Sequence, residues 1–385
     1  MTYQHHFHKG IDFHHFLQKL LAFIKQNVVL CVALLLAVVT SFIVPPDGGY
    51  ASYFDWKTLI CLFCTLAVIC ALKNIKFFTF LARKIVFCTG NLRMAAIALV
   101  YITFIGSMLI SNDMALLTFL PLGYFVLSST GKEKHMAFIF IMQNIAANLG
   151  GMLTPFGNPQ NLYLYSKFNI PTGEFMQIML IPFLVSIALI TVCCLFLPKD
   201  TLSIKEDSAI RLPAKRTFVY ILLFLFSILI VFRIFSHWLG LIVILLSLFF
   251  LDRKALGNVD YALLGTFFCF FIFAGNMARI PQIHALISSL LEQNTLLFSV
   301  LSCQVISNVP SAILLSQFTL DYPALLLGVN IGGTGTLIAS LASLISFKEY
   351  IAHNPKGAGL YLAKFSAYNF GFVIILCAVS YLVLL

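Results

Sequence analysis

Long apolar stretches separated by short polar segments recur along almost the whole chain. Most of them approach or exceed about 20 residues, the length that spans the hydrocarbon core of a bilayer. A backbone in lipid must satisfy its own hydrogen bonds, so these segments are expected to be helices. The pattern predicts an all-α polytopic membrane protein with apolar stretches at about 28–45, 56–72, 94–110, 136–153, 174–198, 216–251, 260–278, 322–345 and 358–385. The stretch 216–251 is long enough for two spans that turn near Ser236 and His237.

The polar segments carry most of the lysines and arginines, in groups that include Lys73 with Lys76, Lys132 with Lys134, and the segment 199–216. Cytoplasmic loops are enriched in these residues. Placing the groups in the cytoplasm predicts a multi-pass protein of the cell membrane, with a cytoplasmic N-terminus and an extracytoplasmic C-terminus.

The role of segment 77–92 is left open between two alternatives. Loops 73–76 and 132–134 lie on the same side of the membrane only if the chain between them crosses the membrane an even number of times. If 77–92 crosses the membrane, 94–110 returns inward and 111–131 forms a re-entrant hairpin. If 77–92 lies on the surface, 94–131 forms an ordinary pair of helices.

Composition agrees with a bilayer as the solvent. Hydrophobic residues make up 61% of the chain and charged residues 10%, whereas about a quarter of a soluble protein is charged. The net charge of +10 would suit nucleic acid, but the basic residues fall in short loops, so membrane topology explains them better. We therefore expect a lipid bilayer and no nucleic acid as partner.

Cysteine and histidine give no strong indication of a metal site. The ten cysteines lie mostly in apolar stretches, where a thiol behaves as a small hydrophobe, so disulfides and bound metals are poor interpretations. The N-terminal histidines are interpreted as part of a solvated or interfacial tail rather than as metal ligands; they are His5, His6, His8, His14 and His15.

An internal repeat relates the two halves of the chain. Segment 148–162 aligns without gaps to 330–344, at an offset of 182. The identical positions are Asn148, Gly150, Gly151, Thr154 and Leu162, which recur as Asn330, Gly332, Gly333, Thr336 and Leu344. Ser111-Asn112 is matched by Ser307-Asn308, and Asp55 before one span by Asp260 before another. In the predicted orientation the two halves are inverted, which is a signature of secondary transporters.

The repeat predicts the organisation of the chain. The first transmembrane repeat covers 28–198 and the second, inverted repeat covers 216–385. Segment 1–27 is an N-terminal cytoplasmic or interfacial segment, and 199–215 is a cytoplasmic linker. We expect about eleven transmembrane helices, two re-entrant hairpins and two broken helices.

The glycines and prolines of 150–159 predict a break in the helix, because proline removes a backbone donor and glycine loosens the chain. Freed backbone groups inside a membrane require a cavity, water or ligand. Carbonyl and side-chain oxygens suit sodium, and half-helix N-termini suit an anion. We predict sodium at Ser111, Asn112 and Gly157, and again at Ser307, Asn308 and Ala339. The substrate and ion site is completed by Asp113, Thr154, Asn158, Asn161, Thr336 and Ser340.

Asp113 is an acidic residue between two apolar runs, where a charge is a functional-site hypothesis by default. It is expected to bind sodium or to carry a coupling proton. The alternative is a helix cap, because Ser-Asn-Asp before an apolar run is also a typical N-terminal signal.

These motifs resemble the ion transporter superfamily. The resemblance rests on Ser111-Asn112-Asp113, on Gly-Gly-x-x-Thr-Pro-x-Gly-Asn-Pro-x-Asn at 150–161, and on Ser307-Asn308-Val309-Pro310, and it covers nearly the whole chain from about 28. The group includes divalent-anion:sodium symporters, citrate transporters, arsenite pumps and NhaD-type antiporters. It implies hairpin tips that bind sodium and carboxylates, an elevator-like motion, and a scaffold that often forms a homodimer. Asp113 and Val309 depart from the Ser-Asn-Thr tips of the dicarboxylate symporters.

Three functions with one architecture follow from the resemblance. The first is a secondary carrier of a small di- or tricarboxylate or inorganic oxyanion, coupled to sodium or protons and needing no other cofactor. The others are a sodium/proton antiporter and an arsenite efflux carrier. A membrane enzyme is disfavoured, because the membrane-embedded acids and histidines form no catalytic constellation and no nucleotide-binding motif is found.

Overall fold

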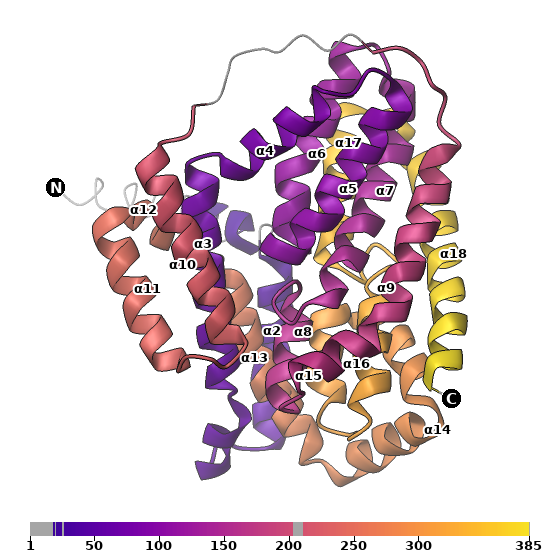
Figure 1. Cartoon of the computed structure of the whole chain (residues 1–385). Helices are drawn as coiled ribbons and strands as arrows, with labels where there is room; N and C mark the ends of the chain where they lie inside the picture. The colour runs from indigo at the N-terminus through magenta and orange to yellow at the C-terminus, as the bar shows by residue number, and fades with distance from the viewer. Residues whose placement is uncertain (1–17, 20, 25–26, 203–210, 385) are drawn as a thin grey trace, which may run out of the picture.

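The computed structural model describes residues 18–19, 21–24, 27–202 and 211–384. The N-terminal histidines and most of the predicted segment 1–27 lie outside these residues, as does part of the linker, 203–210. The described chain is almost entirely helical (Figure 1). It includes eight helices that are long and apolar enough to cross a membrane. The all-α polytopic fold predicted from the apolar pattern is confirmed.

The first half begins with α2 (Val28–Ile43), η1 (Gly48–Tyr53), α3 (Trp56–Asn74) and α4 (Phe77–Val86). The helices α5 (Leu92–Ile110) and α6 (Asn112–Ser129) form a hairpin with its tip at Ser111. After η2 (Glu133–His135) come α7 (Met136–Gly150), η3 (Gly151–Leu153), α8 (Pro159–Lys167) and α9 (Thr172–Leu195).

The second half begins with α10 (Ala214–Val231), α11 (His237–Leu251), α12 (Arg253–Gly257) and α13 (Tyr261–Ala278). A second hairpin consists of α14 (Pro281–Ile306) and α15 (Asn308–Leu315), with its tip at Ser307. It is followed by α16 (Tyr322–Gly332), α17 (Leu341–His353), η4 (Pro355–Gly357) and α18 (Ala358–Leu384). The predicted turn between two spans in 216–251 is confirmed, at 232–236.

Helix α4 decides the role of segment 77–92. Its 10 residues extend only about 15 Å, half the thickness of the hydrocarbon core. A helix of this length does not span the hydrocarbon core, which favours the alternative in which 77–92 lies on the surface. Asp200 holds the base of the hairpin, because Leu92 N donates to Asp200 O (2.8 Å) and Lys132 pairs with Asp200 (2.7 Å).

Helix α14 was not among the predicted spans. Its first half contains Gln282, His284, Glu292 and Gln293, which lower its apolar character. The backbone leaves the helical conformation at Asn294 (φ −166°, ψ 91°), whose Oδ1 accepts a hydrogen bond from Leu297 N (2.8 Å). Asn294 thus caps a second helical half that leads to Ser307, in keeping with the preference of asparagine for N-caps.

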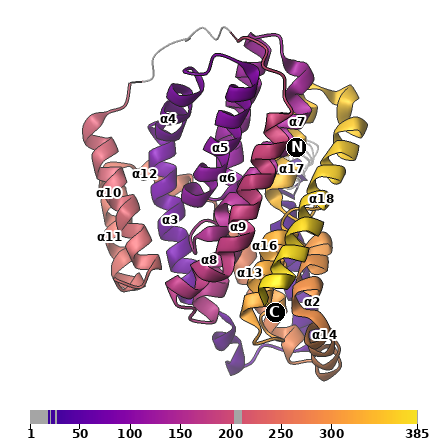
Figure 2. The ribbon, with the colours of Figure 1, turned by 45° about the vertical axis from the view of Figure 1, so that its right-hand side comes forward.

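Two groups of helices surround the hairpins. Helices α10, α11 and α12 pack on α3, and α2 packs along α13. Figure 2 shows α10 and α11 on one side, with α18 on the other. Arg279 after α13 pairs with Asp47 before η1 (2.6 Å). The hydrogen bond from Arg279 holds the pKa of Asp47 below its ordinary value, which stabilises the connection between α2 and α13.

Candidate functional site

The two hairpin tips share one unusual backbone conformation. Ser111 has φ 75° and ψ 157°, and Ser307 has φ 74° and ψ 161°. This region of the backbone map is essentially restricted to glycine, and other residues remain there only where the surrounding structure holds them. The two Ser-Asn motifs found in the sequence therefore form the same strained turn, each between a long helix and the first turn of the next.

Both predicted helix breaks are present. Helix α7 ends at Gly150 and α8 begins at Pro159, while α16 ends at Gly332 and α17 begins at Leu341. A threonine at the equivalent position of each break bonds to the helix that leads to the hairpin tip of the same half. Thr154 Oγ1 donates to Met108 O (3.3 Å), and Thr336 Oγ1 donates to Gln304 O (3.1 Å).

The first tip contacts both breaks. Asn112 Nδ2 donates to Asn148 Oδ1 (3.2 Å) near the end of α7 and to Ser340 Oγ (3.3 Å) at the start of α17. The carboxylate of Asp113 lies near the backbone amide of Ala342 in the first turn of α17. The prediction placed Asn112 and Ser340 in different halves of one substrate and ion site, and the structure brings these two side chains together.

The second tip is bonded to its own break. Ser307 Oγ and Asn308 N both donate to Ala339 O, at 3.2 and 3.0 Å. Val309 N donates to Asn308 Oδ1 (2.9 Å). Ser307, Asn308 and Ala339 thus lie together as predicted, and their oxygens already take part in local hydrogen bonds.

Asn161 joins the two broken helices. Its Nδ2 lies within hydrogen-bonding distance of the carbonyl oxygens of Gly151 (3.1 Å) and Met152 (3.3 Å) in the first break. Its Oδ1 accepts from Asn330 Nδ2 of α16 at 2.6 Å. The side chain of Asn161 is fully buried. It therefore satisfies carbonyls that the break leaves free and also connects the two halves; its assignment as a ligand stays a prediction.

Gly157 has a steric role in the first break. Its backbone N–H donates to Thr154 O (3.2 Å). A Cβ atom at this position would collide with the carbonyl oxygen of Gly151 and with Thr154 Oγ1. Only glycine allows the chain to fold back this closely before α8, so the Gly157-Asn158 pair predicted from the motif forms the compact part of the turn.

Several buried polar atoms near these segments have no hydrogen-bond partner within the described structure. They are Asn112 Oδ1, Asp113 Oδ1, Asn144 Nδ2, Asn158 Oδ1 and Asn330 Oδ1. Leaving such an atom unpaired costs about 1–3 kcal/mol each. A group of them around the hairpin tip and the two breaks is expected where a ligand, ion or water completes the bonding.

A small cavity lies between the first tip and α3. It is lined by Ser111, Asn158, Pro159, Phe156 and Leu162 on one side, and by Leu62, Thr65, Leu66 and Ile69 of α3 on the other. Its volume of about 10 Å³ admits about one water-sized particle, whereas ligand pockets measure about 300–1,000 Å³. A carboxylate substrate would require the tip and α3 to separate.

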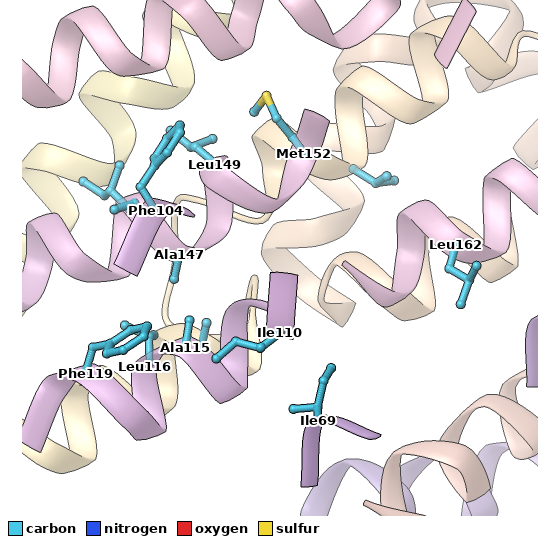
Figure 3. Packing of buried hydrophobic residues seen from close by; sticks show 14 of the residues in the cluster. Ile69, Phe104, Ile110, Ala115, Leu116, Phe119, Ala147, Leu149, Met152 and Leu162 are labelled. Carbon is cyan, nitrogen blue, oxygen red and sulfur yellow. The ribbon is translucent and has the colours of Figure 1, made fainter. Parts of the chain in front are cut away.

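Apolar packing surrounds the polar centre. Figure 3 shows Phe104, Ile110 and Phe119 of the first hairpin near Ala147 and Leu149 of α7. All five side chains are buried. The tip is therefore held in a low-dielectric setting, which strengthens its interactions with charge.

Gln304 was missed in the sequence although it organises the second break. Its Nε2 donates to Gly332 O (2.9 Å), and its Oε1 accepts from Thr336 N (2.8 Å). The available signal was an amide residue inside an apolar run, three positions before Ser307. Among the residues that the structure describes, no group of three or more His, Cys, Asp or Glu side chains is arranged to bind a metal ion.

Comparisons with known proteins agree with this architecture. The sequence model of a citrate transporter family matches residues 20–323, which include both hairpin tips. An uncharacterized transporter of Methanocaldococcus jannaschii is 33% identical over 295 residues, 76% of this chain and 81% of the relative. The inner membrane protein YbiR of Escherichia coli is 28% identical over 323 residues, 82% of this chain and 86% of the relative. The chain therefore belongs to the citrate transporter family, a family of membrane transporters.

Proposed function

We propose that this secondary transporter moves a small anion, a di- or tricarboxylate or an inorganic oxyanion, coupled to sodium or protons. The observation that carries the proposal is the meeting of two half-helix N-termini with one strained hairpin tip. Asn158 precedes α8 and Ser340 precedes α17, and both contact the network around Asn112. Helix N-termini carry partial positive charge and free N–H groups, which favour an anion.

The oxygen atoms of the first tip supply the other half of the chemistry. Asn112 Oδ1, Asp113 Oδ1 and Asn158 Oδ1 are buried and unpartnered in the described structure. Hard cations such as sodium prefer oxygen ligands. A cation or proton at Asp113 would offset its negative charge and remove the repulsion of an incoming anion, which gives a physical basis for coupling.

An elevator-like movement is part of the proposal. The boundary between the first tip and α3 is mainly apolar, with Leu62, Leu66 and Ile69 facing Phe156 and Leu162 across the small cavity. A boundary of this kind slides without breaking many hydrogen bonds. Movement of the hairpins and broken helices past α3 would open the space that an anion needs.

Sodium/proton antiport is the second candidate, and Asp113 favours it. An acidic side chain near the tip with a buried, unpartnered oxygen is able to exchange a proton for sodium. Arsenite efflux remains a further alternative within the same architecture.

Uptake by proteoliposomes tests the proposal. We expect labelled citrate, succinate or sulfate to accumulate when an inward sodium or proton gradient is imposed. Asn308→Ala should reduce the initial rate at least about tenfold, because it removes tip contacts worth about 1.4 kcal/mol or more in the bound state.

The matched control is Asn369→Ala. Asn369 is a buried asparagine of α18 whose Nδ2 donates to Phe365 O within its own helix (2.8 Å), so its loss should leave uptake close to that of the parent chain. Sodium/proton exchange reported by a pH-sensitive dye, without uptake of any tested anion, would contradict the proposal and establish the antiporter.

A further inference from the structure

Two basic side chains meet at the end of α3 that is predicted to face the outside of the cell. Resting on the proposed function, we propose that Lys57 and Arg233 form an entry subsite, which binds the anionic substrate before it reaches the small cavity at the first tip. Lys57 lies in the first turn of α3. Arg233 lies in the turn between α10 and α11, toward the lower end of Figure 1. The loop at the opposite end of α3, 73–76, is lysine-rich and predicted to be cytoplasmic.

Neither cation of the entry subsite has an acidic partner. No Asp or Glu of the described residues forms an ion pair with Lys57 or Arg233. Arg233 Nη2 donates to Tyr165 O (2.6 Å), and the guanidinium lies 4.1 Å from the centroid of the Tyr165 ring. Its Nε is buried and has no hydrogen-bond partner in the described structure. An oxygen of a bound anion would provide the missing acceptor.

The charges of this region add up to an excess of positive charge. Lys57 interacts electrostatically with both Arg233 and Asp55, and the side chain of Cys61, one turn further along α3, lies within electrostatic range of all three. Asp55 supplies one negative charge against two positive ones. His237, the first residue of α11, also lies within range of Lys57 and Asp55. The N-termini of α3 and α11 therefore add partial positive charge to the same region.

Membrane topology does not account for these two cations. Lysine and arginine are enriched in cytoplasmic loops, so their presence at the outer end needs another explanation. Arg279 at the same end has one, because it pairs with Asp47 (2.6 Å) and connects α13 to the segment after α2. Lys57 and Arg233 lack such a pair, and the helix dipole disfavours a lysine in the first turn of α3. Unpaired cations in an unfavourable position are expected where an anion binds.

The entry subsite adjoins the walls of the small cavity. Thr65 of α3 lines the cavity and follows Lys57 by eight residues, about two turns or 12 Å along the helix. Phe232, the residue before Arg233, packs edge-on against Phe156 with ring centroids 5.7 Å apart, and Phe156 also lines the cavity. Both cations are thus connected to its walls. An anion held between them is positioned to enter when the first tip and α3 separate.

The kinetics of uptake from outside the cell test the entry subsite. Initial rates of labelled citrate, succinate or sulfate uptake are measured in cells that produce the full chain, over a range of external concentrations. Lys57→Gln should raise KM at least about threefold, because it removes one attractive charge from the approach of the anion. The maximal rate should stay within about twofold, since the subsite acts before the transport step. Lys57→Arg keeps the charge and should restore KM.

Two further variants separate a local effect from a change in overall charge. Arg233→Gln should raise KM in the same direction as Lys57→Gln. If Arg233→Gln does not fold, Lys57→Gln still decides. Arg279→Gln is the matched control, because it removes one positive charge from the same end of the molecule at a distance from the subsite, and it should leave KM unchanged. An unchanged KM in Lys57→Gln, or an equal rise in Arg279→Gln, overturns the proposal.

The same two cations would also attract the phosphate of a lipid headgroup, so the source of the anion is tested separately. Uptake by the parent chain and by Lys57→Gln is repeated in proteoliposomes of phosphatidylcholine alone and of phosphatidylcholine with phosphatidylglycerol. The rise in KM should be present in both. A rise confined to vesicles that contain phosphatidylglycerol assigns the site to a lipid and overturns the proposal. Failure of the parent chain to carry any of the three anions contradicts the proposed function, and the entry subsite falls with it.

Discussion

At the scale of single residues, the two tip serines have strained backbone conformations. Ser111 and Ser307 both lie at positive φ with an extended ψ, although glycine is the residue suited to that region. Ser307 Oγ has a local acceptor in Ala339 O. Ser111 has no side-chain cap bond, and it lines the small cavity instead. We therefore propose that the Ser111 hydroxyl contacts the ligand, which would offset the cost of keeping serine at this strained position.

Ser111→Gly should therefore stabilise the protein and impair transport. Relief of about 1–3 kcal/mol of backbone strain exceeds the additional unfolded-chain entropy of glycine, about 0.5–1 kcal/mol. Thermal unfolding in detergent and uptake by proteoliposomes measure the two effects. Ser111→Ala is the control, because it removes the same hydroxyl and keeps the strain. Equal stabilities of the two variants would contradict the argument.

At the scale of elements, glycines set the distance between the hairpins and the broken helices. Gly150 of α7 faces the backbone of α5, where a Cβ atom would collide with Phe104 O. Gly332, its counterpart in the repeat, faces Val300 and Cys303 of α14 in the same way. The paired glycines of the motif thus let each broken helix lie directly on the long helix of its hairpin.

Gly150→Ala should separate α7 from α5 and destabilise the chain by about 1–3 kcal/mol, the usual penalty of overpacking. Gly173→Ala is the matched control, since Gly173 lies in the first turn of α9 and a Cβ there meets nothing within 4 Å. Its change should be neutral or stabilising, by up to about 1 kcal/mol. Similar melting temperatures for both variants would show that α5 and α7 tolerate a wider spacing.

At the scale of the whole molecule, the connections fall at two opposite ends. Residues 199–202 after α9, helix α4 and the base of the first hairpin lie at the upper end of Figure 1, whereas the turn between α10 and α11 and the first part of α14 lie toward the lower end. The upper end carries the lysine-rich loops, so charge predicts that it faces the cytoplasm.

Native Cys88 provides a direct test of this orientation. It is the exposed cysteine among those described, and it follows α4 at the upper end. A membrane-impermeant maleimide should label it in inside-out vesicles and leave it unlabelled in intact cells. Leu320→Cys in a Cys88→Ser chain should behave in the opposite manner, because Leu320 is 88% exposed and lies at the other end. Labelling of Cys88 from outside the cell would reverse the proposed topology.

Local signals in the sequence determined much of the architecture. Apolar length located most of the membrane helices, glycine and proline located both breaks, and the two Ser-Asn pairs located both hairpin tips. Each of these features depends on the chemistry of a few consecutive residues. Helix α14 was not predicted, because the polar residues before the kink at Asn294 lower its apolar character. The short α4 was compatible with two topologies.

Only the tertiary structure decided which of the predicted site residues remain free to bind. Asn161 and Asn330 bond across 169 positions, and Asn112 reaches Ser340 across 228. An asparagine has the same donors and acceptors wherever it lies in the chain, so its sequence position does not reveal which of them are occupied. Two nearly equal motifs thus predicted two equal half-sites, whereas the structure leaves Asn112 Oδ1 without a partner and gives Asn308 Oδ1 a hydrogen bond from Val309 N.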